Sequence, residues 1–173
     1  MIEDNIIKWT NLEKVLNEYG MELRNLYRDN LIKNDRIASG DLLNSVEYIV
    51  QSDNMHISVS LKLAKYWKYV EWDTKPHFPP VYDENDETAG IEGWIKIKHV
   101  IYDNRNEKLP TERQLAFMIA KKISEEGTKG THDLHDAINE VNDRYREKIK
   151  DAIATDIKEN STVIFTEFFY KNS

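Results

Sequence analysis

The chain of 173 residues contains no cysteine. Disulfide bonds, thiolate-bound zinc, iron–sulfur clusters and cysteine nucleophiles are therefore excluded. It also lacks a long apolar run, since none approaches the roughly 18 residues that a membrane-spanning helix requires. The first residues, Met1–Asn5, carry acidic charge where a secretory signal carries positive charge. These absences predict a soluble protein, made in the cytoplasm, that does not associate with membranes.

Basic residues are outnumbered as well. The 24 Lys and Arg stand against 31 Asp and Glu, which gives a formal net charge of −7 at pH 7. A protein that wraps nucleic acid needs a basic surface to neutralise phosphates, so this balance argues against such a function. Hydrophobic residues make up 40% of the chain and aromatic residues 10%, which is enough for a core. The length suits a single domain over residues 1–173.

Hydrophobic spacing in the N-terminal half predicts an α+β fold, with a short antiparallel β-sheet packed against long α-helices. Apolar residues at helical spacing indicate a long helix over Ile6–Ile32. Alternating residues predict a hairpin of two strands, Leu43–Gln51 and Met55–Leu63. The expected order is an N-terminal helix in 1–35, a hairpin in 42–64, an aromatic and proline-rich loop in 65–90, helices in 91–160 and a terminal strand or arm in 161–173.

The C-terminal half predicts further helices. The segment Ile91–Ile101 fits a helix and a strand nearly equally well, and a helix is preferred. Thr111 followed by Gln114 has the spacing of a capping box at a helix start, and Gly127 suits the end of that helix. A last helix should run from about residue 128 to 160. Beyond it, Thr162–Tyr170 is rich in β-branched and aromatic residues and predicts a strand.

Motifs of catalysis are missing from the sequence. There is no G-x-S-x-G, P-loop, G-x-G-x-x-G or H-E-x-x-H. His132, His135 and Asp136 would share a helix face and could hold a metal ion, which leaves a small metal-dependent hydrolase that uses these residues, or His77, as an alternative. An exposed first helical turn is the preferred interpretation, because acidic side chains favour helix N-termini. We expect no cofactor, no metal and no catalytic residue.

Two other groups of ionisable residues are further candidates for a functional site. His77 follows Glu71 and Asp73 and could join them in an acid–base cluster, but a rigid proline loop more often binds than catalyses. The acidic segment 83–87 lacks the D-x-[DN]-x-[DN]-G spacing of a calcium loop. A solvated loop is the preferred interpretation of this segment.

Aromatic residues are concentrated beside three prolines, and they are the most informative feature. They would form either a small satellite core or a protein interface, where aromatic side chains dominate the binding energy. A second apolar group in the terminal strand would close the sheet or add to the sheet of a neighbour. The predicted interface residues are Trp67, Tyr69, Trp72, His77, Phe78, Pro79 and Pro80, with Phe168, Phe169 and Tyr170 second.

The order of these motifs resembles the tail-completion or head–tail joining (neck) proteins of tailed bacteriophages, over roughly Trp9 to Ile157. The motifs that carry the resemblance are the long N-terminal helix, Ser39–Val46 before the hairpin, Tyr66–Trp72, Pro76–Pro80, Gly93–Lys96, the helix Leu115–Ile123 and Glu126–Thr131 before the last helix. The resemblance implies an α+β subunit without catalytic residues, located in the virion neck.

The resemblance also implies partners. The subunit would join copies of itself in a ring of twelve or six, with twelve preferred, and would contact portal or adaptor and tail proteins. Genomic DNA would only pass through the lumen of the ring. Closed rings use heterologous interfaces, for which exposed aromatic residues and a rigid proline loop are suitable. A monomeric adaptor that binds one protein partner is a further alternative.

Overall fold

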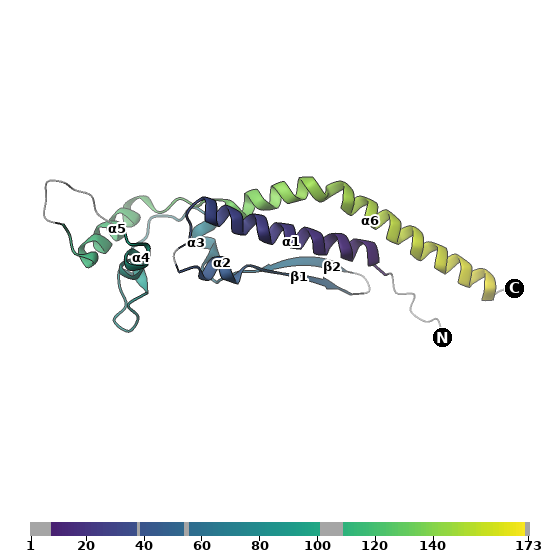
Figure 1. Cartoon of the computed structure of the whole chain (residues 1–173), viewed down its shortest axis with the longest axis horizontal. Helices are drawn as coiled ribbons and strands as arrows, with labels where there is room; N and C mark the ends of the chain where they lie inside the picture. The colour runs from purple at the N-terminus through teal and green to yellow at the C-terminus, as the bar shows by residue number, and fades with distance from the viewer. Residues whose placement is uncertain (1–7, 38, 54–55, 101–108, 172–173) are drawn as a thin grey trace. The chain divides into compact units, whose positions relative to one another are not determined.

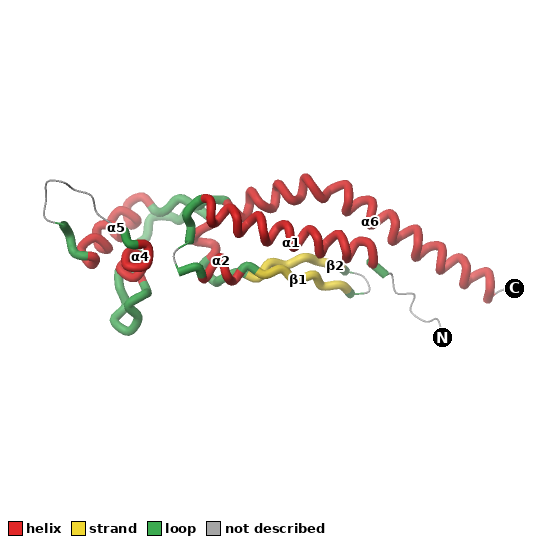
Figure 2. The backbone as a smooth tube through the Cα atoms, in the orientation of Figure 1, coloured by secondary structure: helices red, strands yellow, loops and turns green. Residues whose placement is uncertain are grey.

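The computed structural model describes residues 8–37, 39–53, 56–100 and 109–171, with side chains up to Thr162. Within these residues the expected α+β fold is confirmed, as a two-stranded antiparallel sheet with six helices (Figures 1 and 2). The elements are α1 (Thr10–Lys33), α2 (Asp41–Ser45), β1 (Glu47–Ser52), β2 (Ile57–Lys62), α3 (Trp67–Glu71), α4 (Gly90–Lys98), α5 (Glu112–Glu126) and α6 (Asp133–Lys171).

The chain forms two compact units. Unit 1 comprises 1–31, 45–63 and 133–173, and unit 2 comprises 32–44 and 64–132. Unit 1 therefore holds most of α1, the hairpin and α6, whereas unit 2 holds the short helices α2 to α5. None of the described helices, α6 included, combines the length and apolarity that a bilayer span requires.

In unit 1, α1 and α6 lie side by side in antiparallel orientation, and the hairpin lies along the other side of α1 (Figure 1). Each helix buries one apolar stripe, as the spacing of its apolar residues predicts. The buried residues of the two stripes are Leu12, Leu23, Tyr27, Leu31, Leu134, Ala137, Val141, Tyr145 and Ala152. Gly20 lies on the hairpin side of α1, and a Cβ there would be 2.5 Å from the Tyr48 ring. This glycine is therefore a close packing contact.

The N-terminus of α1 is capped by a residue far along the chain. The Asp156 carboxylate, on α6, accepts hydrogen bonds from the backbone N–H groups of Asn11 (2.9 Å) and Leu12 (2.8 Å). It also accepts one from the Asn11 side chain at 2.8 Å. Asp156 is only 1% exposed. Because the first N–H groups of a helix lack partners within the helix, a buried carboxylate is suited to satisfy them.

A second polar contact joins the middle of the two helices. The Glu22 carboxylate accepts hydrogen bonds from Arg144 and from the Tyr145 hydroxyl, the latter at 2.9 Å. These two donors lower the pKa of Glu22. Burial, followed by the bond to Glu22, raises the pKa of Tyr145 to about 12. Tyr19 packs edge-on against Tyr145 with the ring centroids 5.7 Å apart.

The hairpin begins later than the sequence predicted. β1 pairs with β2 from Glu47 opposite Lys62 to Ser52 opposite Ile57. The expected first strand, Leu43–Gln51, is wrong at its start, because 41–45 forms the short helix α2. Local turn chemistry explains this: Gly40 has a φ of +88°, and Asn44 N donates to its carbonyl. Leu42 is buried on this helix.

The predicted terminal strand is also wrong. Thr162–Tyr170 continues α6, which ends at Lys171 and is 39 residues long. Extending a helix that has already formed adds one hydrogen bond per residue without a new nucleus, so β propensity is overridden. Phe168, Phe169 and Tyr170 therefore neither close the sheet nor add a strand to a neighbour's sheet, and their side chains lie outside the described set.

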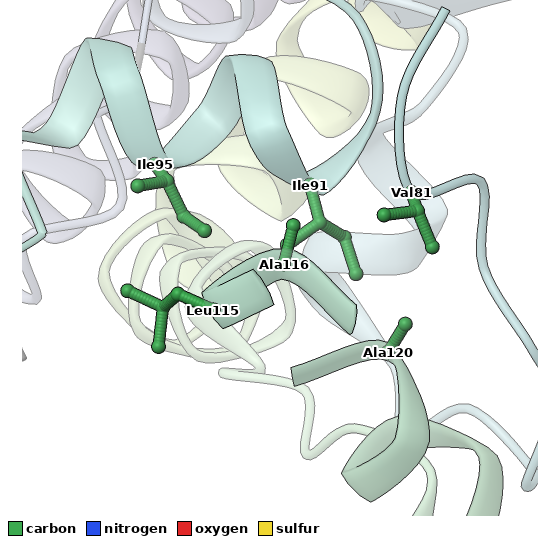
Figure 3. Close-up of a cluster of buried hydrophobic side chains, with 6 residues drawn as sticks. All are labelled: Val81, Ile91, Ile95, Leu115, Ala116 and Ala120. Atoms are coloured by element: carbon green, nitrogen blue, oxygen red, sulfur yellow. The ribbon is translucent and has the colours of Figure 1, made fainter. Parts of the chain in front are cut away.

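In unit 2, α4 and α5 enclose a small apolar core (Figure 3). Ile91 and Ile95 of α4 point toward Leu115 and Ala116 of α5, with Val81 and Ala120 beside them. The predicted capping box at the start of α5 is confirmed. The Thr111 hydroxyl accepts from Gln114 N (3.2 Å), and Gln114 Oε1 accepts from Thr111 N (2.9 Å).

Candidate functional site

The predicted interface centres on α3 and the extended segment that follows it. Tyr69 is 67% exposed, Trp72 45% and Phe78 59%, so these rings are not core residues of unit 2. His77 and Pro80 are exposed, while Trp67 and Pro79 are half-buried. These residues are close together in the sequence, and groups of large exposed aromatic side chains are typical of protein interaction surfaces. We call residues 66–80 the aromatic surface.

A frame of backbone hydrogen bonds holds this surface. The segment 127–132, which precedes α6, runs beside the C-terminal end of α3. Thr131 N donates to the Val70 carbonyl at 3.0 Å, and His132 N donates to the Glu71 carbonyl at 3.1 Å. The last carbonyl groups of a helix have no hydrogen-bond donor within the helix, and the segment 127–132 supplies two such donors. Two motifs that are far apart in the sequence thus form one substructure.

Threonine and aspartate side chains extend the frame. Thr74 N donates to the Thr128 carbonyl (2.9 Å), and the hydroxyls of Thr74 and Thr128 lie 2.7 Å apart. Thr128 N donates to the Thr74 hydroxyl at 3.0 Å. The Asp73 carboxylate accepts from Gly130 N at 2.8 Å. These bonds fix the backbone at Trp72 and at the start of the proline segment.

Two glycines allow the segments to approach so closely. A Cβ on Gly127 would lie 2.0 Å from the Thr74 carbonyl oxygen, and one on Gly130 would lie 2.3 Å from the Glu71 carbonyl oxygen. Gly127 also has φ 74° and ψ −162°, a conformation that is essentially restricted to glycine. The sequence predicted only that Gly127 ends α5, which the structure confirms, and the close approach to Thr74 was not predicted. The repeated Gly-Thr in 127–131 was the available signal.

The three residues of the metal hypothesis do not share a helix face. His132 lies before α6 with a φ of +58°, and its ring packs edge-on against Trp72 with the centroids 5.2 Å apart. His135 and Asp136 are exposed in the first turn of α6. Across the described residues, no three His, Asp or Glu side chains gather closely enough to hold a metal ion.

The residues of the acid–base hypothesis are each engaged separately. His77 Nδ1 lies 2.9 Å from the Lys75 carbonyl oxygen. Asp73 is bonded to Gly130 N, and Glu71 is 1% exposed. Each of the three side chains therefore has its own surroundings, and the described contacts do not join them into an acid–base cluster.

The acidic segment 83–87 lines a pocket of about 300 Å³ beside α4 and α5. The guanidinium carbon of Arg113 lies 4.2 Å from the centroid of the Tyr82 ring. Arg113 also forms a salt bridge with Glu92, with 3.0 Å between Nε and Oε2. Lys96 pairs with the same carboxylate at 3.5 Å. Both cations that line the pocket thus contact Glu92, and sequence reasoning missed this pairing. We call residues 83–87 the acidic loop.

In comparisons with protein-family models, curated proteins and solved structures, nothing matches this chain.

Proposed function

We propose that this chain is a structural subunit of the head–tail connector of a tailed bacteriophage, where it assembles with copies of itself into a ring. The ring would join the portal or an adaptor to tail proteins and enclose the channel through which DNA passes. On this proposal the chain is a virion protein of the neck and catalyses no reaction.

The observation that carries the proposal is the aromatic surface on its frame. Tyr69, Trp72 and Phe78 are exposed, yet the backbone beneath Trp72 is fixed by hydrogen bonds. Such an arrangement suits binding, because a surface that is already ordered loses little conformational entropy when it meets a partner. Both halves of the frame are motifs on which the resemblance to neck proteins depends.

The charge balance is compatible with a channel protein. A net charge of −7 disfavours retention of DNA, which a conduit must release. The described contacts give the hydrolase alternative no support, because the His132 ring packs against Trp72 and His135 is exposed in the first turn of α6. The charge balance and the contacts of the histidines therefore favour a role in assembly over catalysis.

The first test is electron microscopy of lysates from a phage that lacks this gene. The proposal predicts filled heads without tails, or heads that leak DNA. Intact infectious particles would exclude a connector role.

The second test is Phe78→Ala. Phe78 is 59% exposed, so its truncation should change the free energy of unfolding by less than about 0.5 kcal/mol while impairing ring assembly. Circular dichroism and sedimentation velocity measure the two effects. The matched control is Phe117→Ala, an aromatic residue of α5 that is 47% exposed and lies outside the aromatic surface. Equal assembly by both variants and the wild type would contradict the proposal.

A further inference from the structure

We propose that the aromatic surface of one copy of this chain binds the acidic loop of a second copy, head to tail. This inference rests on the proposed function, because it names the partner of the surface within the ring. We assign a second copy of the chain as the partner because the two surfaces carry opposite charge.

The aromatic surface carries excess positive charge. Lys65, Lys68 and Lys75 are exposed within or beside it, and Lys129 is exposed on the segment that frames it. The acidic residues of the same two segments are Glu71 and Asp73. The first is 1% exposed, and the carboxylate of the second is bonded to Gly130 N. Four exposed lysines therefore outnumber the exposed carboxylates of Asp73 and of Asp41, whose charge acts on Tyr66 of the surface.

The acidic loop carries the opposite charge. Asp83, Glu84, Asp86 and Glu87 are four acidic residues among five positions, and all are exposed. The cations beside the loop, Lys96 and Arg113, pair with Glu92 of α4. Because these two cations share one carboxylate, and Arg113 also interacts electrostatically with Glu84, they offset about one of the four negative charges of the loop. The loop therefore keeps a net negative charge. Tyr82, 39% exposed and next to the loop, adds an aromatic ring to the same surface.

These two surfaces are different parts of unit 2, separated along the chain by Val81 and Tyr82. On this proposal each copy uses its aromatic surface against one neighbour and its acidic loop against another, which makes the contact heterologous, whereas reciprocal use of both surfaces by two copies would give a closed dimer that sedimentation velocity distinguishes from a ring. Heterologous contacts propagate from copy to copy and close into a ring when the rotation permits. Apolar rings would supply most of the affinity at the centre, and the charges would set partner choice and orientation at the rim.

The test uses paired charge reversals that leave structural hydrogen bonds intact. Asp83 accepts from Asn85 N, and Asp86 accepts from Thr88, so both are retained. The lysine variant is Lys68→Glu with Lys75→Glu, and the loop variant is Glu84→Lys with Glu87→Lys. The control is Lys121→Glu with Lys122→Glu, two exposed lysines of α5.

Self-association is measured by sedimentation velocity at increasing protein concentration, at low and high salt. We expect each paired variant to weaken self-association by at least about tenfold, and the control to match the wild type. A chain that carries both reversals restores complementarity and should associate again. An equimolar mixture of the lysine and loop variants should associate as well, because each acidic surface then meets a basic one.

Several outcomes would overturn the inference. A wild-type chain that stays monomeric at about 1 mM has no self-docking surface of this kind. Failure of the doubly reversed chain to associate would mean that the lysines serve another partner. Loss of duplex DNA binding in the lysine variant, with self-association unchanged, would assign the surface to nucleic acid. If both charge-reversal variants assemble like the wild type while Phe78→Ala does not, the proposed ring is retained and the acidic loop is excluded as the partner of the aromatic surface.

Discussion

Unit 1 and unit 2 use their aromatic residues in opposite ways. In unit 1, Tyr27 and Tyr145 are buried, and long helices are tied together by carboxylates that accept several hydrogen bonds. In unit 2, short helices surround a small core, and backbone contacts through glycine hold the frame. Among the described side chains, the exposed large aromatic residues all belong to unit 2, and they are Tyr66, Tyr69, Trp72, Phe78, Tyr82, Trp94 and Phe117.

The difference indicates a division of roles. Among the described side chains, unit 1 exposes single aliphatic residues such as Met21, Ile49 and Ile157 but no large aromatic ring, whereas unit 2 displays Trp72 beside a backbone that hydrogen bonds fix. The free energy of unfolding should therefore depend on side-chain contacts in unit 1. In unit 2 it should depend on the close packing of backbone segments that glycine allows. Substitutions can test each half of this comparison.

The largest effect is expected for Gly127→Ala, which breaks the frame in unit 2. The new Cβ would collide with the Thr74 carbonyl oxygen and force alanine into a glycine-only conformation. We expect a loss of at least about 3 kcal/mol in the free energy of unfolding, measured by urea denaturation. Gly40→Ala is the control, because its φ is +88° but its Cβ would lie 3.4 Å from Asn44, so it should cost about 1–2 kcal/mol. Equal losses would argue against the close approach.

A slightly smaller effect is expected for Asp156→Ala in unit 1. The substitution leaves the N–H groups of Asn11 and Leu12 without their acceptor, which should cost about 2–3 kcal/mol. Asp151→Ala, an exposed position on the same helix, should change stability by less than about 0.5 kcal/mol. Asp156→Asn keeps one acceptor oxygen, so its loss of stability should lie between those of Asp156→Ala and Asp151→Ala. A neutral Asp156→Ala would show that α1 does not depend on this cap.

Alkaline pH should weaken unit 1 through Tyr145. Its pKa is raised to about 12 in the folded chain, above the ordinary value of 10, so folding favours the protonated phenol. The associated stability is complete below pH 10 and is lost as the pH rises toward 12, by about 1–2 kcal/mol. Urea unfolding of the wild type and of Tyr145→Phe over this range measures the difference. Identical pH profiles would contradict the assignment.

The smallest effect on stability is expected for Tyr69→Ala. The ring is 67% exposed, so its removal should change the free energy of unfolding by less than about 0.5 kcal/mol. The same variant should assemble less well than the wild type in sedimentation velocity. A large loss of stability here would assign Tyr69 to a core and remove the contrast between the units.

Local rules predicted those elements whose signals lie within a few residues. The capping box of Thr111 and Gln114 and the end of α5 at Gly127 follow from such rules, and the structure confirms them. The Leu43–Gln51 strand and the terminal strand were wrong because propensity competes with turn chemistry in one case and with helix extension in the other. The sequence singled out the aromatic residues beside the prolines but left open whether they form a satellite core or an interface, and their exposure is a finding of the structure.

Contacts between distant residues had no such signal. The cap at Asn11 is made by Asp156, and the frame joins Val70 to Thr131. A carboxylate on a helix has the same appearance in the sequence whether it faces water or another helix end. An alignment of relatives would have provided the missing signal as covariation between such pairs.

The order in which the two units can be completed follows from how they are built. Unit 2 ends at His132, whereas unit 1 needs α6 from Asp133 onward and has its cap at Asp156. A ribosome releases the N-terminal residues first. All of unit 2 is thus synthesised while α1 and the hairpin still lack their long partner helix, and contacts of such large sequence separation form slowly. Newborn chains should therefore present the aromatic surface before unit 1 is finished, so premature association during translation is a hazard that this topology carries.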